Sequence, residues 1–508
     1  MSIFCVTLRN VLGLSLYVIV TLGQNTEEVA VRSSTSSCLD LGGGRDVSEY
    51  AVGNLPNVNF DLPASWAGQI SVPSTANDEL FFWLFQAEVA GECDNLIIWL
   101  NGGPGCSSLD GLTKENGPLY FPGNATTPTS NPNSWTQLAS VLYIDQPVGT
   151  GYSDGSNQAS LNAQVTQDFA SWLQAFYDIF PSLRSKNTYI MGESYAGVYI
   201  PYFTQAFLAN NSLSFNLKGI AIGDGSFGNL AVSTDVVATT YLNEHNQILQ
   251  IPRDVLNLFD EADQVCGFTE ILNEASYPPS GPLTVPGDPE GANYRLIKRQ
   301  NATNDNGCPP DPNTPALLNS SFSLCNGGCA TWTTAANYLT SNRPCFSVYN
   351  IEYNCDNAPD TTDFVNWLNL PAVREAIHAP NKTYQDCNST VFDTLAVEQV
   401  EPPAYRIMPA ILEAGVPIHL YSGDLDFILS HIGTEVAIQN MTWCGHQGFQ
   451  ATPNNTFLVN GQNMGNWGYE RGLSYHHILS AGHAVPYDQP AAAFAFVRDF
   501  VVGDAGYR

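Results

Sequence analysis

The chain has 508 residues, of which 44% are hydrophobic and 11% are aromatic. This composition excludes a chain that is disordered throughout, because so much apolar surface can bury a large core. Eighteen lysine and arginine residues against 48 aspartate and glutamate residues leave a formal net charge of −30, which repels nucleic acid and anionic membranes. Most of that charge titrates away near about pH 4 to 5, so the composition suits an acidic compartment.

Residues 1–23 predict a secretory signal peptide. They combine one basic residue, Arg9, an apolar run over 11–20 and small residues around Gly23. The run is shorter than the roughly 20 apolar residues that a membrane span needs, although a membrane anchor is the alternative interpretation. No later stretch is apolar enough to span a bilayer. We therefore expect a soluble, secreted protein, with a vacuolar or lysosome-like compartment as the alternative destination.

Twelve cysteines are present, and Cys5 belongs to the predicted signal peptide. In a secretory protein the others are expected to form disulfide bonds, with one cysteine left unpaired. Their spacing relative to histidine does not fit a zinc site, so we expect no metal and no other cofactor. N-glycosylation is predicted at the asparagines of Asn-X-Ser/Thr sequences, which are Asn124, Asn210, Asn301, Asn319, Asn381, Asn388, Asn440 and Asn454.

From residue 80 the chain alternates short apolar strands with turns. Strands are predicted over 80–85, 96–100 and 140–145, and their unbroken apolar character is typical of a sheet that is buried on both faces. Apolar residues at helical spacing predict a helix over 165–180, and a further strand follows at 188–191. This order predicts an α/β fold with a mostly parallel central sheet flanked by helices.

The composition changes between residues 243 and 360. Proline, glycine, asparagine and six cysteines replace the apolar runs there, which predicts a disulfide-rich insertion or cap. The sheet pattern then resumes, with a helix over 364–378, strands over 416–421 and 474–479, and a closing helix over 491–501. The expected division is a signal peptide at 1–23, two parts of the core at 24–242 and 361–508, and the insertion at 243–360.

A basic pair lies inside the predicted insertion. Lys298 and Arg299 stand between a Pro/Gly-rich stretch and a polar one, and they have the dibasic form that secretory processing proteases cleave. One hypothesis is a mature protein of two chains that disulfide bonds hold together. The alternative is an uncut pair on a solvated loop.

The segment 192–197 has the sequence Gly-Glu-Ser-Tyr-Ala-Gly, and it lies between a predicted strand and a helix predicted over 198–208. This is the context of a nucleophile elbow, a tight turn that exposes a serine hydroxyl above the edge of the sheet. Ser194 is therefore the candidate nucleophile. The motif departs from Gly-X-Ser-X-Gly because Ala196 takes the last small position. An ordinary strand-to-helix turn is the alternative interpretation.

A serine nucleophile needs a base, and the base needs a carboxylate that fixes its tautomer. Asp426 follows the strand at 416–421 and His483 follows the strand at 474–479, so nucleophile, acid and base come in the order of α/β-hydrolases. Asp424 competes with Asp426, and the residues alone leave that choice open. Three other histidines fall within predicted strands and are expected to be packed or surface groups: His419, His476 and His477.

A glycine-rich segment at 99–108, Trp-Leu-Asn-Gly-Gly-Pro-Gly-Cys-Ser-Ser, follows the strand at 96–100. Hydrolases place such a loop there, and its backbone N–H groups bind the oxyanion of the tetrahedral intermediate. Gly103 and Tyr195 are the candidate donors. A plain glycine-rich turn is the alternative.

These motifs belong to a longer series at 99–108, 115–118, 145–153, 192–197, 218–223, 423–427 and 482–486. In these segments, and in their order, the chain resembles the serine carboxypeptidase family, in particular its fungal secreted or vacuolar members, from about residue 60 to the end. The resemblance implies an α/β-hydrolase fold. It also implies a peptide hydrolase that releases C-terminal amino acids from peptides and proteins through an acyl-enzyme on Ser194, with a preference for acidic pH.

The resemblance further implies particular roles. Asp426, rather than Asp424, completes the triad, the N–H groups of Gly103 and Tyr195 form the oxyanion hole, and Cys106 pairs with Cys387. The residues implied to bind the terminal carboxylate of the substrate are Asn101, Gly102, Glu115 and Glu193. Asp224 is a modest departure, since the family often has asparagine after this glycine.

The two glutamates have a consequence of their own. Glu115 and Glu193 would face a substrate carboxylate, and like charges at hydrogen-bonding distance are not all ionised, so a proton must be shared. Substrate binding should then be stronger at acidic pH. A serine carboxypeptidase-like acyltransferase is the alternative function, but Glu115 and Glu193 suit a free C-terminus and argue for hydrolysis. A non-catalytic binding protein is a third possibility, against which the intact triad argues.

Overall fold

The structure is a computed structural model that describes residues 47–123, 125–156, 161–210, 213–283, 329–359, 362–396, 398 and 400–503. The predicted signal peptide, the Lys298-Arg299 pair and the sequons at Asn124, Asn301 and Asn319 lie outside these residues. Within the described ranges, no helix combines the length and the apolar character needed to cross a membrane.

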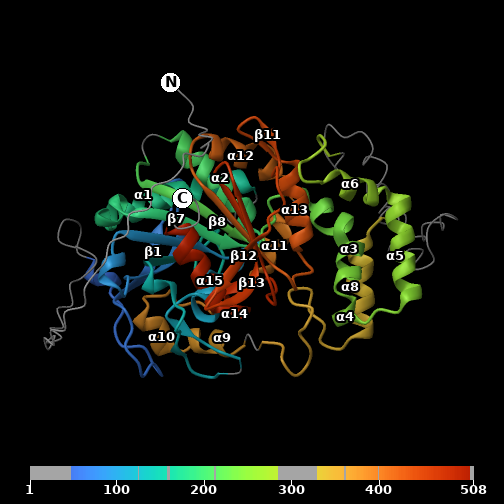
Figure 1. Ribbon diagram of the computed structural model, residues 1–508. Helices are drawn as coiled ribbons and strands as arrows, with labels where there is room; N and C mark the ends of the chain where they lie inside the picture. The colour runs from blue at the N-terminus through green and yellow to red at the C-terminus, as the bar shows by residue number, and fades with distance from the viewer. Residues whose placement is uncertain are drawn as a thin grey trace, which may run out of the picture.

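Ten strands of the described chain form one sheet in the order β1-β2-β6-β3-β7-β8-β9-β14-β13-β12 (Figure 1). The centre is parallel from β6 through β3, β7, β8 and β9 to β14, and antiparallel strands extend both edges. The predicted α/β fold with a mostly parallel sheet is confirmed. The bounds are β1 Ser65–Ser71, β2 Glu79–Phe85, β3 Asn95–Leu100, β6 Ser140–Asp145, β7 Asn187–Glu193, β8 Asn216–Gly223, β9 Ile418–Gly423, β12 Asn455–Val459, β13 Gln462–Glu470 and β14 Leu473–Ile478.

Both faces of this sheet are buried, as the apolar strands predict. Successive side chains of a strand point to opposite faces, so β2 supplies alternate residues to two separate apolar cores. One core is covered by α1, α2 and α12, and the other by α9, α10 and α15 (Figure 1). The bounds of the helices beside the sheet are α1 Asn162–Ile179, α2 Ala196–Ala209, α9 Thr362–Leu368, α10 Pro371–Ala376, α11 Ser389–Leu395, α12 Pro403–Glu413, α13 His431–Asn440, α14 Val485–Asp488 and α15 Pro490–Phe496.

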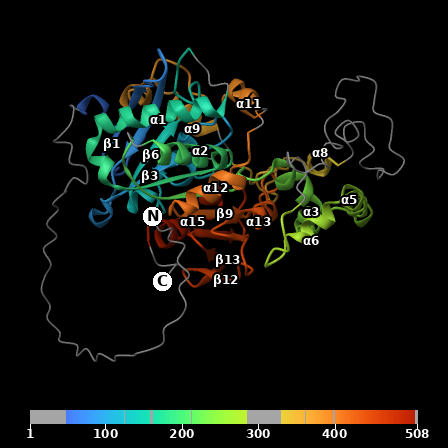
Figure 2. The ribbon, with the colours of Figure 1, turned by 90° about the horizontal axis from the view of Figure 1, so that it is seen from above.

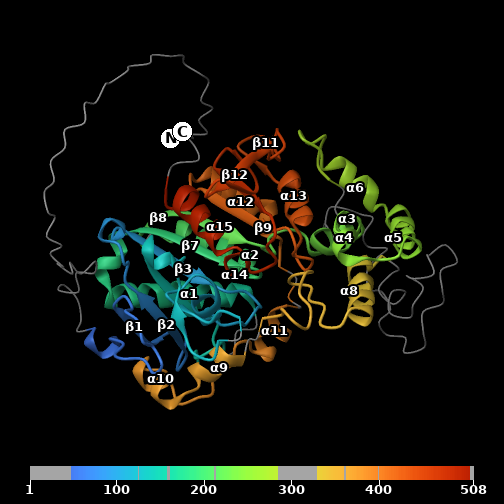
Figure 3. The ribbon, with the colours of Figure 1, turned by 60° about the horizontal axis from the view of Figure 1, so that its bottom comes forward.

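A group of helices lies to one side of the sheet (Figures 2 and 3). It comprises α3 Val237–Glu244, α4 Asn246–Leu249, α5 Arg253–Cys266, α6 Phe268–Glu274 and α8 Thr331–Asn342. The core of α3, α4, α5 and α8 also contains Leu425 and Phe427, from the loop that follows β9. The group therefore holds the loop that carries Asp426. The boundaries 243–360 for an insertion stay a prediction, and α3 begins before them.

The prediction of one continuous helix over 364–378 is wrong. The structure has α9 and α10 instead, and Leu370, between them, is extended with φ −62° and ψ 130°. Pro371 explains the break, because a proline ring disfavours the helical conformation of the preceding residue. Proline also suits the first turn of the next helix, where its missing N–H is not needed.

All cysteines in the described part of the chain are disulfide-bonded, so the predicted unpaired cysteine is not among them. Cys106 pairs with Cys387 across 281 residues, Cys266 with Cys329 across 63, and Cys345 with Cys355 across 10. The Cys106–Cys387 bond ties the glycine-rich loop to the segment before α11.

The Cys266–Cys329 bond brackets the dibasic pair in the sequence, and this permits a test of the cleavage hypothesis. A chain cut after Arg299 stays one covalent species until a reductant breaks the bond. We expect two bands after reduction, and one without it, when deglycosylated protein from its native secretory pathway is separated by denaturing electrophoresis. A single full-length band under reduction would contradict the two-chain hypothesis.

The predicted glycosylation sites differ in accessibility. Asn210, Asn381 and Asn454 are exposed. Asn388 is half-buried, caps α11 and donates its amide to the carbonyl of Gly149 at 2.9 Å. Asn440 is also half-buried, and its side-chain oxygen Oδ1 accepts a hydrogen bond from the N–H of Leu283 at 3.0 Å. Glycosylation stays a prediction at these sites. On Asn388, the nitrogen that would carry the glycan is the same atom that donates a hydrogen bond to Gly149.

Candidate active site

Ser194 lies in the turn between β7 and α2, at the carboxyl edge of the parallel strands. Its φ of +61° is in the left-handed region, which non-glycine residues adopt with strain and which is typical of a nucleophile elbow. Its N–H donates to Gly223 at 3.0 Å, and its carbonyl accepts from Gly197 and Ser226. A Cβ added to Gly192 would lie 2.9 Å from Cβ of Ala196. Both positions therefore need small residues, which Ala196 satisfies.

His483 meets Asp426 because their strands are neighbours. β9 and β14 pair in parallel, and the loops beyond their carboxyl ends are joined by the hydrogen bond from Leu425 N–H to Ala481 at 2.7 Å. Nδ1 of His483 lies 2.8 Å from Oδ2 of Asp426. Both side chains are buried, with 6% and 0% of their surface exposed. This pairing orients the imidazole as a general base requires.

Asp424 has different partners. Its Oδ1 lies 3.0 Å from Nε2 of His477 and 3.5 Å from Nε2 of His245. His477 in turn stacks on His431, with ring centroids 4.1 Å apart. The structure thus places Asp426, not Asp424, against His483. The remaining strand histidines, His419 and His476, are buried in β9 and β14.

The glycine-rich loop after β3 lies directly against the elbow. A Cβ on Gly102 would clash with the backbone nitrogen of Tyr195 and would lie 2.7 Å from Cβ of Ser194, so only glycine fits there. Gly103 follows with φ +106°, which again favours glycine. The two candidate oxyanion donors, Gly103 and Tyr195, therefore belong to segments that touch beside Ser194.

Three of the predicted carboxylate-binding residues are joined by hydrogen bonds. Nδ2 of Asn101 donates to Oε1 of Glu193 at 3.0 Å and to Oε1 of Glu115 at 3.5 Å. The side-chain oxygen Oδ1 of Asn101 accepts a hydrogen bond from Nε1 of Trp99 at 2.7 Å, which fixes the orientation of the amide. Gly102 is the next residue along the loop. Glu193 ends β7 immediately before Ser194, so this cluster and the nucleophile are covalent neighbours.

The electrostatics of the two glutamates are unusual. Glu115 and Glu193 are 2% and 5% exposed, and none of the described residues donates a hydrogen bond to the buried Oε2 atom of either. Burial, with the charge of Asp110 next, raises the pKa of Glu115 to about 7. Burial and then the charge of Glu115 raise the pKa of Glu193 well above its ordinary value. At acidic pH both groups hold protons and can donate hydrogen bonds to an anion.

Two residues around His483 were not singled out in the sequence. Oδ2 of Asp488, in α14, accepts the N–H of Gly482 at 2.7 Å and so holds the histidine loop. The ring of Tyr349 packs on the imidazole at 5.3 Å between centroids, and its carbonyl accepts the N–H of His483 at 2.7 Å. Neither lies in a motif, and the segment of Tyr349 is distant in sequence, so no local pattern marks them.

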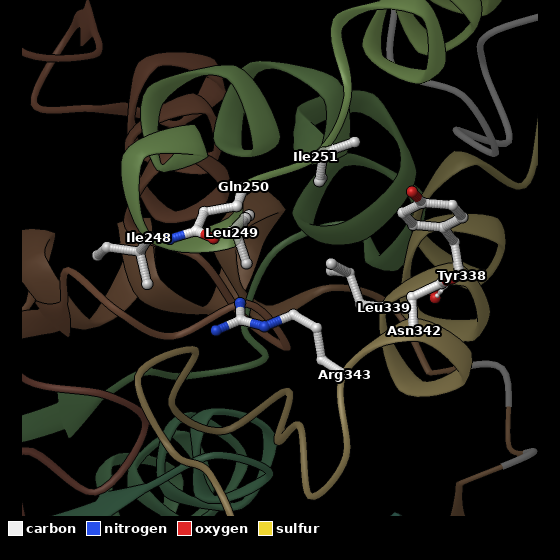
Figure 4. A pocket seen from close by; sticks show the side chains of 8 residues that line it. All are labelled: Ile248, Leu249, Gln250, Ile251, Tyr338, Leu339, Asn342 and Arg343. Carbon is white, nitrogen blue, oxygen red and sulfur yellow. Dashed lines mark hydrogen bonds between the residues drawn. The ribbon is translucent and has the colours of Figure 1, made fainter.

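A cavity of about 260 Å³ lies elsewhere, between α4 and α8 in the helical group (Figure 4). Its walls contain none of the predicted site residues and are formed by Ile248, Leu249, Gln250, Ile251, Tyr338, Leu339, Asn342 and Arg343. The cavity is therefore separate from the cluster around Ser194.

The chain is similar to known proteins over most of its length. The family model described as serine carboxypeptidase matches residues 56–503. A carboxypeptidase Y homolog of Arthroderma benhamiae is 41% identical over 475 residues, which cover 90% of this chain and 94% of that protein. The serine-type carboxypeptidase F of Aspergillus niger is 29% identical over 486 residues, with 88% and 85% covered.

Among solved structures, a prohormone-processing carboxypeptidase from Saccharomyces cerevisiae superposes with a TM-score of 0.66 at 24% identity, over 89% of this chain and 95% of that chain. This likeness shows a shared fold. With the family match over most of the chain, the resemblance seen in the sequence is confirmed, and the chain belongs to the serine carboxypeptidase family.

Proposed function

We propose that this enzyme is an acid-preferring carboxypeptidase that removes single residues from the C-terminus of peptides through an acyl-enzyme on Ser194. One observation carries the proposal, the pair of buried glutamates directly beside the nucleophile. Their buried Oε2 atoms, to which none of the described residues donates a hydrogen bond, and the Asn101 amide suit a substrate carboxylate. A C-terminus held there brings only the last peptide bond to Ser194, so cleavage releases one residue at a time.

The triad supports a general-base mechanism. Oγ of Ser194 attacks the carbonyl carbon of the scissile bond while Nε2 of His483 takes its proton, and Asp426 stabilises the imidazolium through Nδ1. The N–H groups of Gly103 and Tyr195 stabilise the oxyanion. His483 then gives the proton to the leaving amine, which departs as the released amino acid. Water, activated by the same histidine, hydrolyses the acyl-enzyme.

Hydrolysis and acyl transfer differ only in the acceptor of the acyl group. The carboxylate cluster favours peptidase activity, because an acyltransferase has no need to hold a free peptide C-terminus. The family to which the chain belongs supports the same choice. We place the enzyme in the secretory pathway, outside the cell or in a vacuole, on the basis of residues 1–23, the disulfide bonds and the acidic composition.

A peptide library with free C-termini tests the proposal. We expect mass spectrometry to show stepwise loss of single C-terminal residues at about pH 5, with no internal cleavage. The released residues also give the side-chain preference of the site. Transfer of the acyl group to an added alcohol or amine, without release of free acid, would identify an acyltransferase. No turnover with any peptide would contradict the proposed peptidase activity.

A further inference from the structure

A second aspartate lies beside the acid of the triad. Asp224 follows β8 with φ +43°, and none of its surface is exposed. One of its carboxylate oxygens, one from Asp426 and a ring nitrogen of His483 all lie within 4.8 Å of one another. Oδ1 of Asp224 accepts the N–H of Gly423 at 2.8 Å. Oδ2 is buried, and none of the described residues donates a hydrogen bond to it.

The donors around the two carboxyl groups show where a proton belongs. Asp426 accepts hydrogen bonds from Ile428 N–H at 2.8 Å, from Leu429 N–H at 3.2 Å and from His483 at 2.8 Å. Asp224 accepts one. Because hydrogen bonds to a carboxylate favour its ionised form, Asp426 is the ionised partner. Two buried carboxyl groups whose oxygens lie within 4.8 Å of each other do not readily both ionise, so the proton of this pair belongs on Asp224.

We propose that Asp224 is a positioning residue of the triad: its Oδ2 holds a proton and donates it in a hydrogen bond to the carboxylate of Asp426. This inference rests on the proposed function, in which Asp426 serves His483. The bond fixes the rotamer of Asp426 and draws part of its negative charge away from the imidazole. A histidine that faces a weaker charge loses its proton more readily, so the base remains available at lower pH.

The surroundings favour the protonated form. Burial raises the pKa of Asp224 well above its ordinary value, and the charge of Asp426 adds to this effect. The other titratable groups that face Asp224 come from five elements, and none of them is a cation: Glu193 of β7, Tyr241 of α3, Tyr421 of β9, Tyr475 of β14 and Asp488 of α14. Beside these groups, a ring nitrogen of His483 lies within 4.8 Å of a carboxylate oxygen of Asp224.

The test measures how pH affects the labelling of Ser194 by a neutral organophosphate. Labelling needs an unprotonated His483 but no substrate carboxylate, so Glu115 and Glu193 do not contribute to the acid limb. In D224N, the asparagine can accept a hydrogen bond from the N–H of Gly423 and donate one to Asp426, and it does not titrate. In D224A, no side-chain donor to Asp426 remains. We expect the acid limb of D224A to move up by roughly one pH unit and that of D224N to stay near that of the wild type.

Asp263→Asn is the matched control. Asp263 is a buried aspartate of α5 whose pKa burial raises to about 7, and it accepts a hydrogen bond from Thr239 at 2.7 Å. Its replacement should leave the acid limb unchanged. An unmoved limb in D224A, or an equal shift in D224A and D224N, would overturn the proposal. A wild-type protein that is not labelled at any pH would instead contradict the triad itself.

The pH dependence of stability to urea tests independently of catalysis whether Asp224 holds the proton. It compares D224N with the wild type, so it does not require that D224A folds. A raised pKa means that folding retains a proton which the unfolded chain loses above about pH 4, so Asp224 lowers stability as pH rises. Asparagine does not titrate, so D224N does not lose stability in this way as pH rises. We expect the urea midpoint of D224N, relative to the wild type, to rise between about pH 4 and about pH 7. The same difference at both pH values would overturn the assignment of the proton to Asp224.

Discussion

Replacing Ser194 or His483 with alanine is expected to lower kcat/KM for peptide hydrolysis by roughly 10⁴-fold or more, as for other triads. Without the hydroxyl there is no acyl-enzyme, and without the imidazole no group removes the serine proton. Binding should persist, because Asn101, Glu115 and Glu193 are untouched. Initial rates of amino-acid release, with circular dichroism as the check on folding, measure the effect. Activity within about tenfold of the wild type in either variant would contradict the assignment.

Two aspartates of one loop offer a sharper comparison. Asp426→Asn should lower activity nearly as much as loss of the histidine, since the amide cannot stabilise the imidazolium that Asp426 faces at 2.8 Å. Asp424→Asn should keep activity within roughly tenfold, because Asp424 contacts His477 and His245 instead. His446→Ala, at an exposed position, controls for the loss of a histidine. An equal loss in both asparagine variants would show that the loop as a whole, and not Asp426, matters.

The second large effect concerns the free C-terminus of the substrate and its dependence on pH. The protonated form of Glu115 donates to the substrate carboxylate, and its pKa is raised to about 7. Binding is therefore favoured below that pH and is lost as pH rises through it. We expect kcat/KM for free-acid peptides to fall about tenfold per pH unit above pH 7. Paired assays of a peptide and its C-terminal amide, from about pH 5 to about pH 8, measure the effect.

The amide is the substrate control, since it has no anion for Glu115 to repel. It should react more slowly than the acid at about pH 5, and the difference should shrink as pH rises. Glu115→Gln is the matched protein variant, because glutamine donates a hydrogen bond at every pH and should flatten the decline for the acid. Equal rates for acid and amide at about pH 5 would contradict the carboxylate-binding role of Asn101, Glu115 and Glu193.

Local patterns in the sequence were enough to predict most strands and helices and the position of the nucleophile Ser194. The apolar strands, the helix over 165–180 and the elbow at Ser194 depend on residues close together in the chain, so they could be predicted from spacing and turn chemistry. The order Ser194, Asp426, His483 and the positions beyond strand ends followed in the same way. The broken helix at Pro371 shows the limit of periodicity, because α9 and α10 keep the same apolar spacing on both sides of the proline.

Only the tertiary structure decided which side chains meet. Asp424 and Asp426 are two residues apart, and the parallel pairing of β9 with β14 brings Asp426 to His483 and Asp424 to His477. Asn101 and Glu193 come together because β3 and β7 are neighbours in the sheet, though far apart in the chain. Sheet order and burial set these contacts, and burial also sets the proton affinity of carboxyl groups. Local sequence encodes neither, so the protons that Glu115, Glu193 and Asp224 hold at acidic pH are properties of the fold.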